Sequence, residues 1–198
     1  MISIAAATFP APTIDETAHA SKPETAVLAG GCFWGMEAVF DHVKGVVSVV
    51  SGYSGGDSDT AHSDQVETGR TGHAESVEIT YDPSQITYGQ LLKVFFAIAH
   101  DPTQLNRQGP DSGKQYRSVI FYAGDEQKRV AETYIRQLSA VRIFKHKIVT
   151  QVVPLAGFYP AEDVLQHYSE HHPTSSYVVQ NDLPKLEALK ARYPDLYR

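Results

Sequence analysis

A short apolar segment that ends in two glycines places the strongest constraint on the fold of this chain. Residues 26–29 read Ala-Val-Leu-Ala, which predicts a strand that is buried on both faces. After Gly30 and Gly31, apolar side chains recur at helical spacing, at Phe33, Met36, Phe40 and Val43. Gly45 predicts the end of that helix. We therefore expect ordered structure to start near Thr25, with a buried strand that turns directly into a helix.

Strand and helix patterns alternate along the rest of the chain. Valine-rich or alternating segments predict strands over residues 46–53, 73–82, 118–122 and 147–153. Apolar periodicity predicts helices over residues 91–98 and 126–141, and a last helix after Asn181 and Asp182. A polar loop spans residues 54–71. A second, long loop spans residues 100–115, and loops as long as this one are usually functional. Because only loops separate several strands, we expect an α+β fold, a two-layer sandwich with helices packed on one face of a mixed β-sheet.

The 198 residues fit one domain with a sizeable core. Residues 1–24 are rich in Ala, Thr and Pro without periodicity and predict a flexible N-terminal tail, followed by a single catalytic domain over residues 25–198. The net charge is −6, and no basic block offers a footprint for nucleic acid. No apolar run approaches the roughly 20 residues that span a bilayer. We expect a cytoplasmic monomer, although export of a precursor that was later trimmed stays open.

Cys32 is the only cysteine of the chain, so no internal disulfide can form. It follows the glycine pair and begins the predicted helix, where unpaired backbone N–H groups and the helix dipole favour a thiolate. We therefore expect a lowered thiol pKa and a nucleophilic role for Cys32. The alternative is an inert cysteine at a structural turn.

Two further patterns surround this cysteine. Phe33 and Trp34 follow it directly and could form an apolar wall for a small methyl-bearing group, although Phe33 also fits the helix stripe as a core residue. Glu75 has the same strand parity as Val77 and Ile79, on the apolar face of its strand. A buried carboxyl has a raised pKa, which suits a general acid near neutral pH. Alternatively, Glu75 precedes the regular strand and is solvated.

Five motifs in sequence carry a resemblance to a known family. They are GCFWG at 31–35, GYSGG at 52–56, TGHAE at 71–75 with YDP at 81–83, the loop HDPT…NRQG…D…QYRS at 100–118, and FYPAE at 158–162. In this order they resemble the peptide methionine sulfoxide reductase A family, from about Thr25 to about Lys190. The resemblance implies a ferredoxin-like version of the α+β fold. It also implies repair of oxidised proteins by thiol-dependent reduction of methionine sulfoxide. The substrate would be the S epimer, either free or protein-bound, and no cofactor would be bound.

By resemblance, Cys32 attacks the sulfoxide sulfur and becomes a sulfenic acid as methionine leaves. Phe33 and Trp34 match the residues that hold the methyl group of the substrate. Glu75 matches the acid that gives a proton to the sulfoxide oxygen.

Asp111 and Tyr116 match an aspartate and a tyrosine of the active-site loop. The resemblance implies that Tyr116 bonds the sulfoxide oxygen or a water there, and that Asp111 orders this network. From the residues alone, Tyr116 could be a core residue and Asp111 a turn residue.

The chain departs from the family pattern at two points. Ser63 stands where the family usually carries a second active-site tyrosine, and a serine hydroxyl has a shorter reach. Many members also have resolving cysteines near the C-terminus, which this chain lacks. The sulfenic acid on Cys32 would then be reduced by an external thiol, for which thioredoxin, glutaredoxin and glutathione are the candidates.

Three alternatives belong to other classes. One is a Cys-His acyl-transfer enzyme with His73 as the base. A second is a metal-binding module built on His167, His171 and His172, because His167 and His171 lie four residues apart, a spacing that can bind zinc on a helix. The acidic residue of such a motif is missing, and our predicted site contains no metal ligand. A third is a domain that binds oxidised methionine without turnover.

Overall fold

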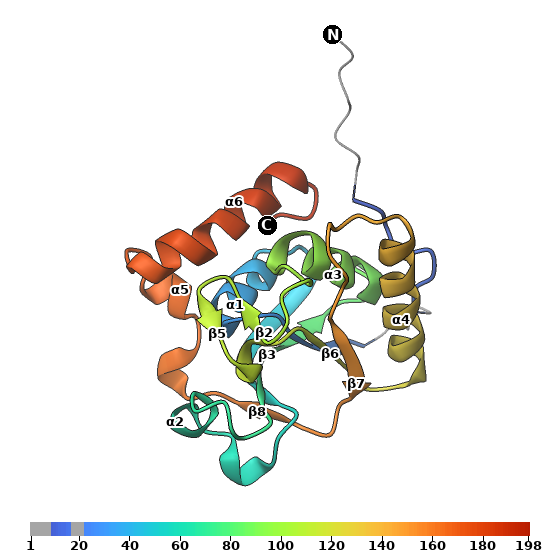
Figure 1. Cartoon of the computed structure of the whole chain (residues 1–198). Coiled ribbons are helices and arrows are strands. Elements are labelled where there is room, and N and C mark those ends of the chain that lie inside the picture. The colour runs from blue at the N-terminus through green and yellow to red at the C-terminus, as the bar shows by residue number, and fades with distance from the viewer. Residues whose placement is uncertain (1–8, 17–21) are drawn as a thin grey trace.

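A six-stranded mixed sheet forms the centre of the molecule in the computed structural model, which describes residues 9–16 and 22–198 (Figure 1). The strand order is β7-β6-β1-β3-β2-β8. Only β6 and β7 pair in parallel, and the other neighbours are antiparallel. The strands are β1 (Glu24–Ala29), β2 (Val46–Ser54), β3 (Ala74–Tyr81), β6 (Val119–Tyr122), β7 (Gln151–Pro154) and β8 (Phe158–Pro160).

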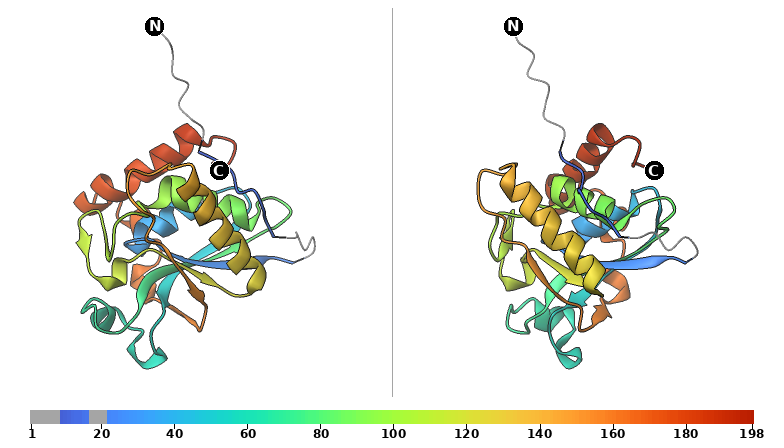
Figure 2. Two further views of the ribbon diagram at one scale, coloured as in Figure 1. Left: turned by 45° about the vertical axis from the view of Figure 1, so that its right-hand side comes forward. Right: turned by 90° about the vertical axis from the view of Figure 1, so that its right-hand side faces the viewer.

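The longer helices pack on one face of this sheet. They are α1 (Phe33–Asp41), α3 (Tyr88–Val94), α4 (Asp125–Ala140) and α6 (Leu183–Arg192). The short helix α2 (Ser63–Val66) lies on the opposite side, within the segment that joins β2 to β3 (Figures 1 and 2). The main core fills the space between the helices and the sheet, and a smaller apolar cluster around Val27 and Phe121 lies on the other face. The predicted two-layer α+β fold is therefore confirmed.

Local sequence explains where the helices begin. The side chain of Thr87 accepts a hydrogen bond from the Gln90 N–H, while the Gln90 side chain accepts one from the Thr87 N–H. This capping box starts α3, which continues into a π-helical turn, η2 (Phe95–Ala99). Pro184 occupies the first turn of α6, as the sequence predicted.

Some elements differ from the sequence prediction. The strand expected over 147–153 is β7, which begins only at Gln151, and β8 was not predicted. The long loop over residues 100–115 contains a small hairpin, β4 (Arg107–Gln108) and β5 (Asp111–Ser112), and the 3-10 helix η3 (Lys114–Tyr116) starts within it. After β8 come the short helices η4 (Asp163–Leu165), α5 (Tyr168–His171) and the π-helical η5 (Val178–Asp182). Another 3-10 turn, η1 (Ser58–Thr60), precedes α2.

The N-terminal region is partly packed on the domain. Phe9 is buried, and the backbone carbonyl of Pro10 accepts a hydrogen bond from Tyr134 of α4. The Asp15 carboxylate accepts hydrogen bonds from the Thr87 hydroxyl and the Gly89 N–H at the start of α3. For residues 9–16, this placement differs from the flexible tail that the sequence predicted. Residues 1–8 and 17–21 of that predicted tail lie outside the described residues.

Candidate active site

The turn between β1 and α1 presents the cysteine. Gly31 has a φ of 97°, and a Cβ there would lie 2.5 Å from the Gln108 side chain, so only glycine fits. Cys32 is the N-cap residue of α1 and is partly exposed. The predicted position of the thiol at the start of a helix is therefore confirmed.

Cys32 opens into a cavity of about 230 Å³. Segments that are distant in the sequence line it, and they contribute Cys32, Phe33, Trp34, Tyr53, Ser63, Val66, Glu67, Glu75, Asp111, Tyr116, Leu165 and Tyr177. All six residues that the sequence singled out as catalytic or substrate-binding are in this set. A cavity of this size, with apolar walls and a few convergent polar groups, suits a small ligand group.

Glu75 lies next to the cysteine at the start of β3. Its side chain is 7% exposed, and its Oε2 accepts a hydrogen bond from the Phe33 N–H at 3.0 Å. Burial, reinforced by the charge of Asp111, raises the Glu75 pKa to about 8, although the bond from Phe33 opposes the rise. Glu75 is therefore mostly protonated at pH 7 and can donate a proton, as its strand parity predicted.

The pKa of Cys32 differs from the sequence prediction. The backbone N–H of Trp34 does favour the thiolate, as expected at a helix N-terminus. However, burial of the thiol, together with the negative charge of Glu75, raises the Cys32 pKa well above its ordinary value. The prediction of a lowered pKa is therefore wrong for the unliganded protein, because the cost of burying the charge exceeds the gain from one turn of helix.

Aromatic rings form one wall of the cavity. Phe33 is buried and its ring lies 5.7 Å from that of Tyr53, so it belongs both to the core and to the wall. Trp34 stacks on Tyr168 with ring centroids 3.7 Å apart and meets Tyr177 edge-on at 5.8 Å. This aromatic contact fixes the orientation of the indole ring beside Cys32.

Polar groups complete the lining of the cavity. The Tyr177 hydroxyl donates a hydrogen bond to the Asp111 carboxylate, and it also interacts with Cys32. Burial raises the pKa of Tyr177 and of Tyr116, so both hydroxyls remain protonated donors. Sequence reasoning missed Tyr177, whose only signal was an aromatic residue in a polar stretch before the last helix.

Ser63 begins α2 and lines the cavity, but its polar groups are already engaged. Its N–H and its hydroxyl both donate to Glu162 Oε1 at 3.0 Å. The Tyr53 hydroxyl donates to the other oxygen of Glu162 at 3.3 Å. Glu162 therefore ties α2 and β2 together at the rim of the cavity.

The histidines predicted for the alternatives do not reach Cys32. His73 is buried and does not line the cavity; its Nε2 donates to the Asp57 carbonyl and its Nδ1 accepts from the Gly56 N–H. His167 has a left-handed backbone, with φ 50°, and precedes the four-residue helix α5. His167 and His171 therefore do not share a regular helical face, and their rings lie 6.3 Å apart. His167 contacts Asp41 of α1 instead.

A partly exposed thiol, a protonated carboxyl and an aromatic wall share one small cavity on an α+β scaffold. Together, the fold and this site are consistent with an enzyme of the oxidoreductase class. Within the described residues, no helix has the length and apolar character to cross a membrane.

Comparison with known proteins identifies the family. The family model described as peptide methionine sulfoxide reductase matches residues 24–195. A peptide methionine sulfoxide reductase MsrA 2 of Mesorhizobium japonicum is 57% identical over 184 residues, which cover 93% of this chain and 94% of that protein. The chain belongs to the peptide methionine sulfoxide reductase MsrA family, and it catalyses the reduction of methionine sulfoxide.

Solved structures agree with this assignment. Reduced Mxr1 from Saccharomyces cerevisiae superposes with a TM-score of 0.70 at 32% identity, covering 80% of this chain and 91% of that one. The same yeast protein in complex with Trx2 gives a TM-score of 0.50 at 26% identity, covering 81% and 94% of the two chains. The fold predicted from the motifs is therefore confirmed.

Proposed function

We propose that Cys32 attacks the sulfur of a methionine S-sulfoxide while Glu75 supplies the proton to the departing oxygen. The observation that carries this proposal is that both groups face one cavity and that Glu75, with a pKa near 8, holds a proton at neutral pH. Protonation of the sulfoxide oxygen makes the sulfur more electrophilic. A neutral carboxyl beside the sulfoxide oxygen therefore accelerates the attack on sulfur.

The proton balance explains how a thiol with a raised pKa can react. Cys32 hydrogen-bonds Glu75, so the thiol proton can pass to this carboxylate as Glu75 releases its own proton to the sulfoxide oxygen. A bond forms between the sulfur of Cys32 and the substrate sulfur, and the oxygen then moves to Cys32 as methionine leaves. The products are Cys32 sulfenic acid and methionine, and Glu75 ends the step protonated.

The walls of the cavity orient the substrate. Phe33 and Trp34 offer the apolar surface for the methyl group of the sulfoxide. Tyr116 lines the cavity as a donor for the oxygen, and the hydrogen bond from Tyr177 to Asp111 orders the polar groups beside it. Apolar and polar groups at fixed positions around one sulfur favour one epimer, and we propose the S epimer.

We propose that an external thiol completes the cycle. Cys32 is the only cysteine in the 198 residues, so its sulfenic acid condenses with an outside thiol to give a mixed disulfide and water. A second thiol then releases Cys32 and leaves as a disulfide. The complex of yeast Mxr1 with Trx2 supports thioredoxin as the reductant, with glutaredoxin or glutathione as the other candidates. This dependence on free thiols favours a reducing compartment such as the cytoplasm.

A single turnover without reductant tests the chemistry. The enzyme should form one methionine per chain and leave one sulfenic acid at Cys32, detectable by mass spectrometry after trapping. With glutathione present, the same mass analysis should show a mixed disulfide instead. Methionine produced in stoichiometric amount with neither species on Cys32 would contradict the cycle.

Two variants assign the residues. Cys32→Ser should abolish reduction while circular dichroism shows a retained fold. Glu75→Gln should slow the single-turnover rate by about 10²–10⁴-fold. Glu78→Gln is the matched control, because Glu78 lies on the same strand as Glu75 but does not line the cavity, and it should stay within about twofold of the parent. A Glu75→Gln rate equal to that of the control would exclude Glu75 as the proton donor.

A further inference from the structure

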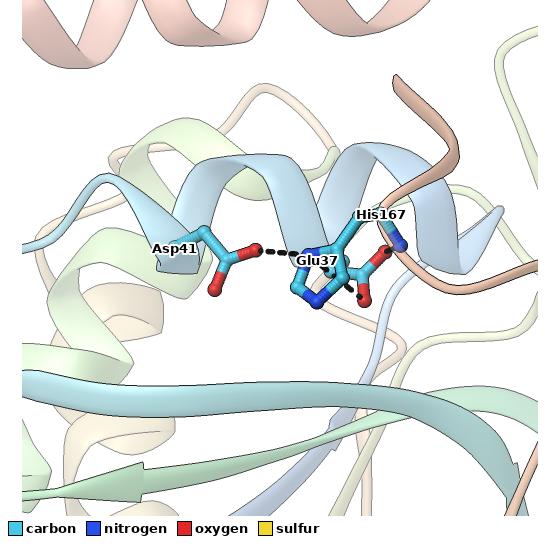
Figure 3. A group of neighbouring side chains, drawn as sticks. All are labelled: Glu37, Asp41 and His167. Atoms are coloured by element: carbon cyan, nitrogen blue, oxygen red, sulfur yellow. Dashed lines mark hydrogen bonds and ion pairs between the residues drawn. The ribbon is translucent and has the colours of Figure 1, made fainter. Parts of the chain in front are cut away.

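Two acids and one histidine converge outside the catalytic cavity. Glu37 and Asp41 lie one turn apart on α1, and both side chains point toward His167, which precedes α5 (Figure 3). His167 Nδ1 is 3.1 Å from Asp41 Oδ2 and 3.8 Å from Glu37 Oε1. One ligand atom from each residue lies within 4.8 Å of the others. We call these three residues the acid–histidine cluster.

Glu37 is the unusual member of this cluster. It is 1% exposed, and its Oε2 accepts a hydrogen bond from the His167 backbone N–H at 2.8 Å. Its Oε1 is buried and points toward the imidazole of His167; no described residue lies at full hydrogen-bonding geometry to it, although the Ser51 hydroxyl is close to the Glu37 carboxyl. A buried carboxylate oxygen without a donor is costly, and a bound cation is one way to satisfy it.

Acidic side chains outnumber arginine and lysine in the lining of the cavity beside the cluster. Arg198 is the nearby cationic side chain; its guanidinium donates to the backbone carbonyls of Asp41 and Val46, and its charge also acts on the Asp41 carboxylate. Glu170 adds a further acid to the lining of the adjoining cavity.

We propose that Glu37, Asp41 and His167 form a binding site for a divalent transition-metal ion of the Zn²⁺ type. Zinc binds imidazole nitrogen and carboxylate oxygen at roughly 2.0–2.2 Å, which places neighbouring ligand atoms about 3–3.5 Å apart. The two separations from His167 are close to this range, and its ring is 44% exposed, so a small movement completes the geometry. An imidazole ligand favours such an ion over Mg²⁺ or Ca²⁺.

The adjoining cavity gives the ion access and further ligands. It measures about 670 Å³, larger than the catalytic cavity, and all three members of the cluster line it. Three protein ligands leave at least one position of a tetrahedral ion open, and water from this cavity can occupy it.

Metal binding would act on the wall of the catalytic site. The residue after His167 is Tyr168, whose ring stacks on Trp34. An ion that joins His167 to α1 would therefore hold this stack in place. This consequence rests on the proposed role of Trp34 in the catalytic cavity, whereas zinc binding itself does not.

A zinc titration of the full chain tests the site directly. The background is Cys32→Ser, which removes the thiol as a competing ligand, and the protein is first treated with EDTA and dialysed. Isothermal titration with Zn²⁺ at pH 7.5 should give one ion per chain. The single tryptophan of the chain, Trp34, should report the same event as a saturable change in fluorescence.

Variants of the two more exposed ligands keep the test independent of folding. His167→Gln and Asp41→Asn should each weaken zinc binding at least tenfold and remove the fluorescence change, with an unchanged circular dichroism spectrum. His171→Gln is the matched control, since His171 ends the short helix that follows His167 but lies outside the cluster, and it should stay within twofold. No zinc binding below 1 mM, or binding that His167→Gln leaves unchanged, would overturn the proposal. Neither result would affect the assignment of Cys32 and Glu75.

Discussion

Replacement of Glu75 by glutamine should change how the stability of the protein depends on pH. Burial raises the Glu75 pKa from 4.5 to about 8 in the folded state, so folding favours the neutral carboxyl. The stability that this group provides is fully present below pH 4.5, the unfolded value, and is lost as the pH rises toward 8. Glutamine has nearly the same shape but does not ionise, so it removes this loss.

The magnitude follows from the two pKa values. At pH 7 the unfolded chain has lost the Glu75 proton while the folded protein mostly keeps it, which costs the parent about 3 kcal/mol of unfolding free energy. At pH 4 the cost is close to zero. Any penalty for burying the amide of glutamine is the same at both pH values. The difference in stability between variant and parent should therefore shift by about 3 kcal/mol in favour of the variant between pH 4 and pH 7.

Urea unfolding of both proteins at pH 4, 5, 6 and 7 measures this shift. The other titratable groups are shared, so their contributions cancel in the comparison. A difference that stays constant within about 0.5 kcal/mol across this range would refute the raised pKa, and with it the argument that Glu75 is a neutral acid.

Three further results are expected. The single-turnover rate, followed by stopped flow, should be nearly constant below pH 7 and fall about tenfold per pH unit above pH 8, because Glu75 loses its proton. A rate that is unchanged at pH 10 would contradict this. Tyr177→Phe removes the donor to Asp111 and should lower the turnover rate by about 10²-fold without loss of fold, whereas full activity would show that this hydroxyl is not needed. Phe40→Ala should reduce the unfolding free energy measured with urea by about 3–5 kcal/mol, because Phe40 is fully buried between α1 and the sheet. A loss below about 1 kcal/mol would mean that the surrounding core collapses into the gap.

The parts of the site that the sequence could predict depend on local rules. Cys32 is recognisable because a buried strand, a glycine pair and a helical stripe lie next to one another in the chain. The inward orientation of Glu75 follows from the two-residue period of its strand. Neither prediction requires knowledge of how distant segments of the chain pack against each other.

The parts that could not be predicted depend on contacts between distant segments. The pKa of Cys32 is set by burial under residues from several elements, which no local pattern reports. Tyr177 reaches Asp111 across 66 positions of sequence. Residues 9–16 show no periodicity because they form no regular helix or strand. Single contacts, such as the hydrogen bond from Tyr134 to the Pro10 carbonyl, hold them in place.

The assembly of the catalytic cavity from distant segments has a consequence for folding kinetics. The bond between the Phe33 N–H and Glu75 spans 42 residues, and that between Ser63 and Glu162 spans 99. Contacts with large sequence separation form late, because chain closure must be completed before they contribute. Helices α1 and α4 can therefore form in a refolding chain that still lacks a working site. The return of sulfoxide reduction should lag behind the return of helical circular dichroism, so activity reports the last stage of folding.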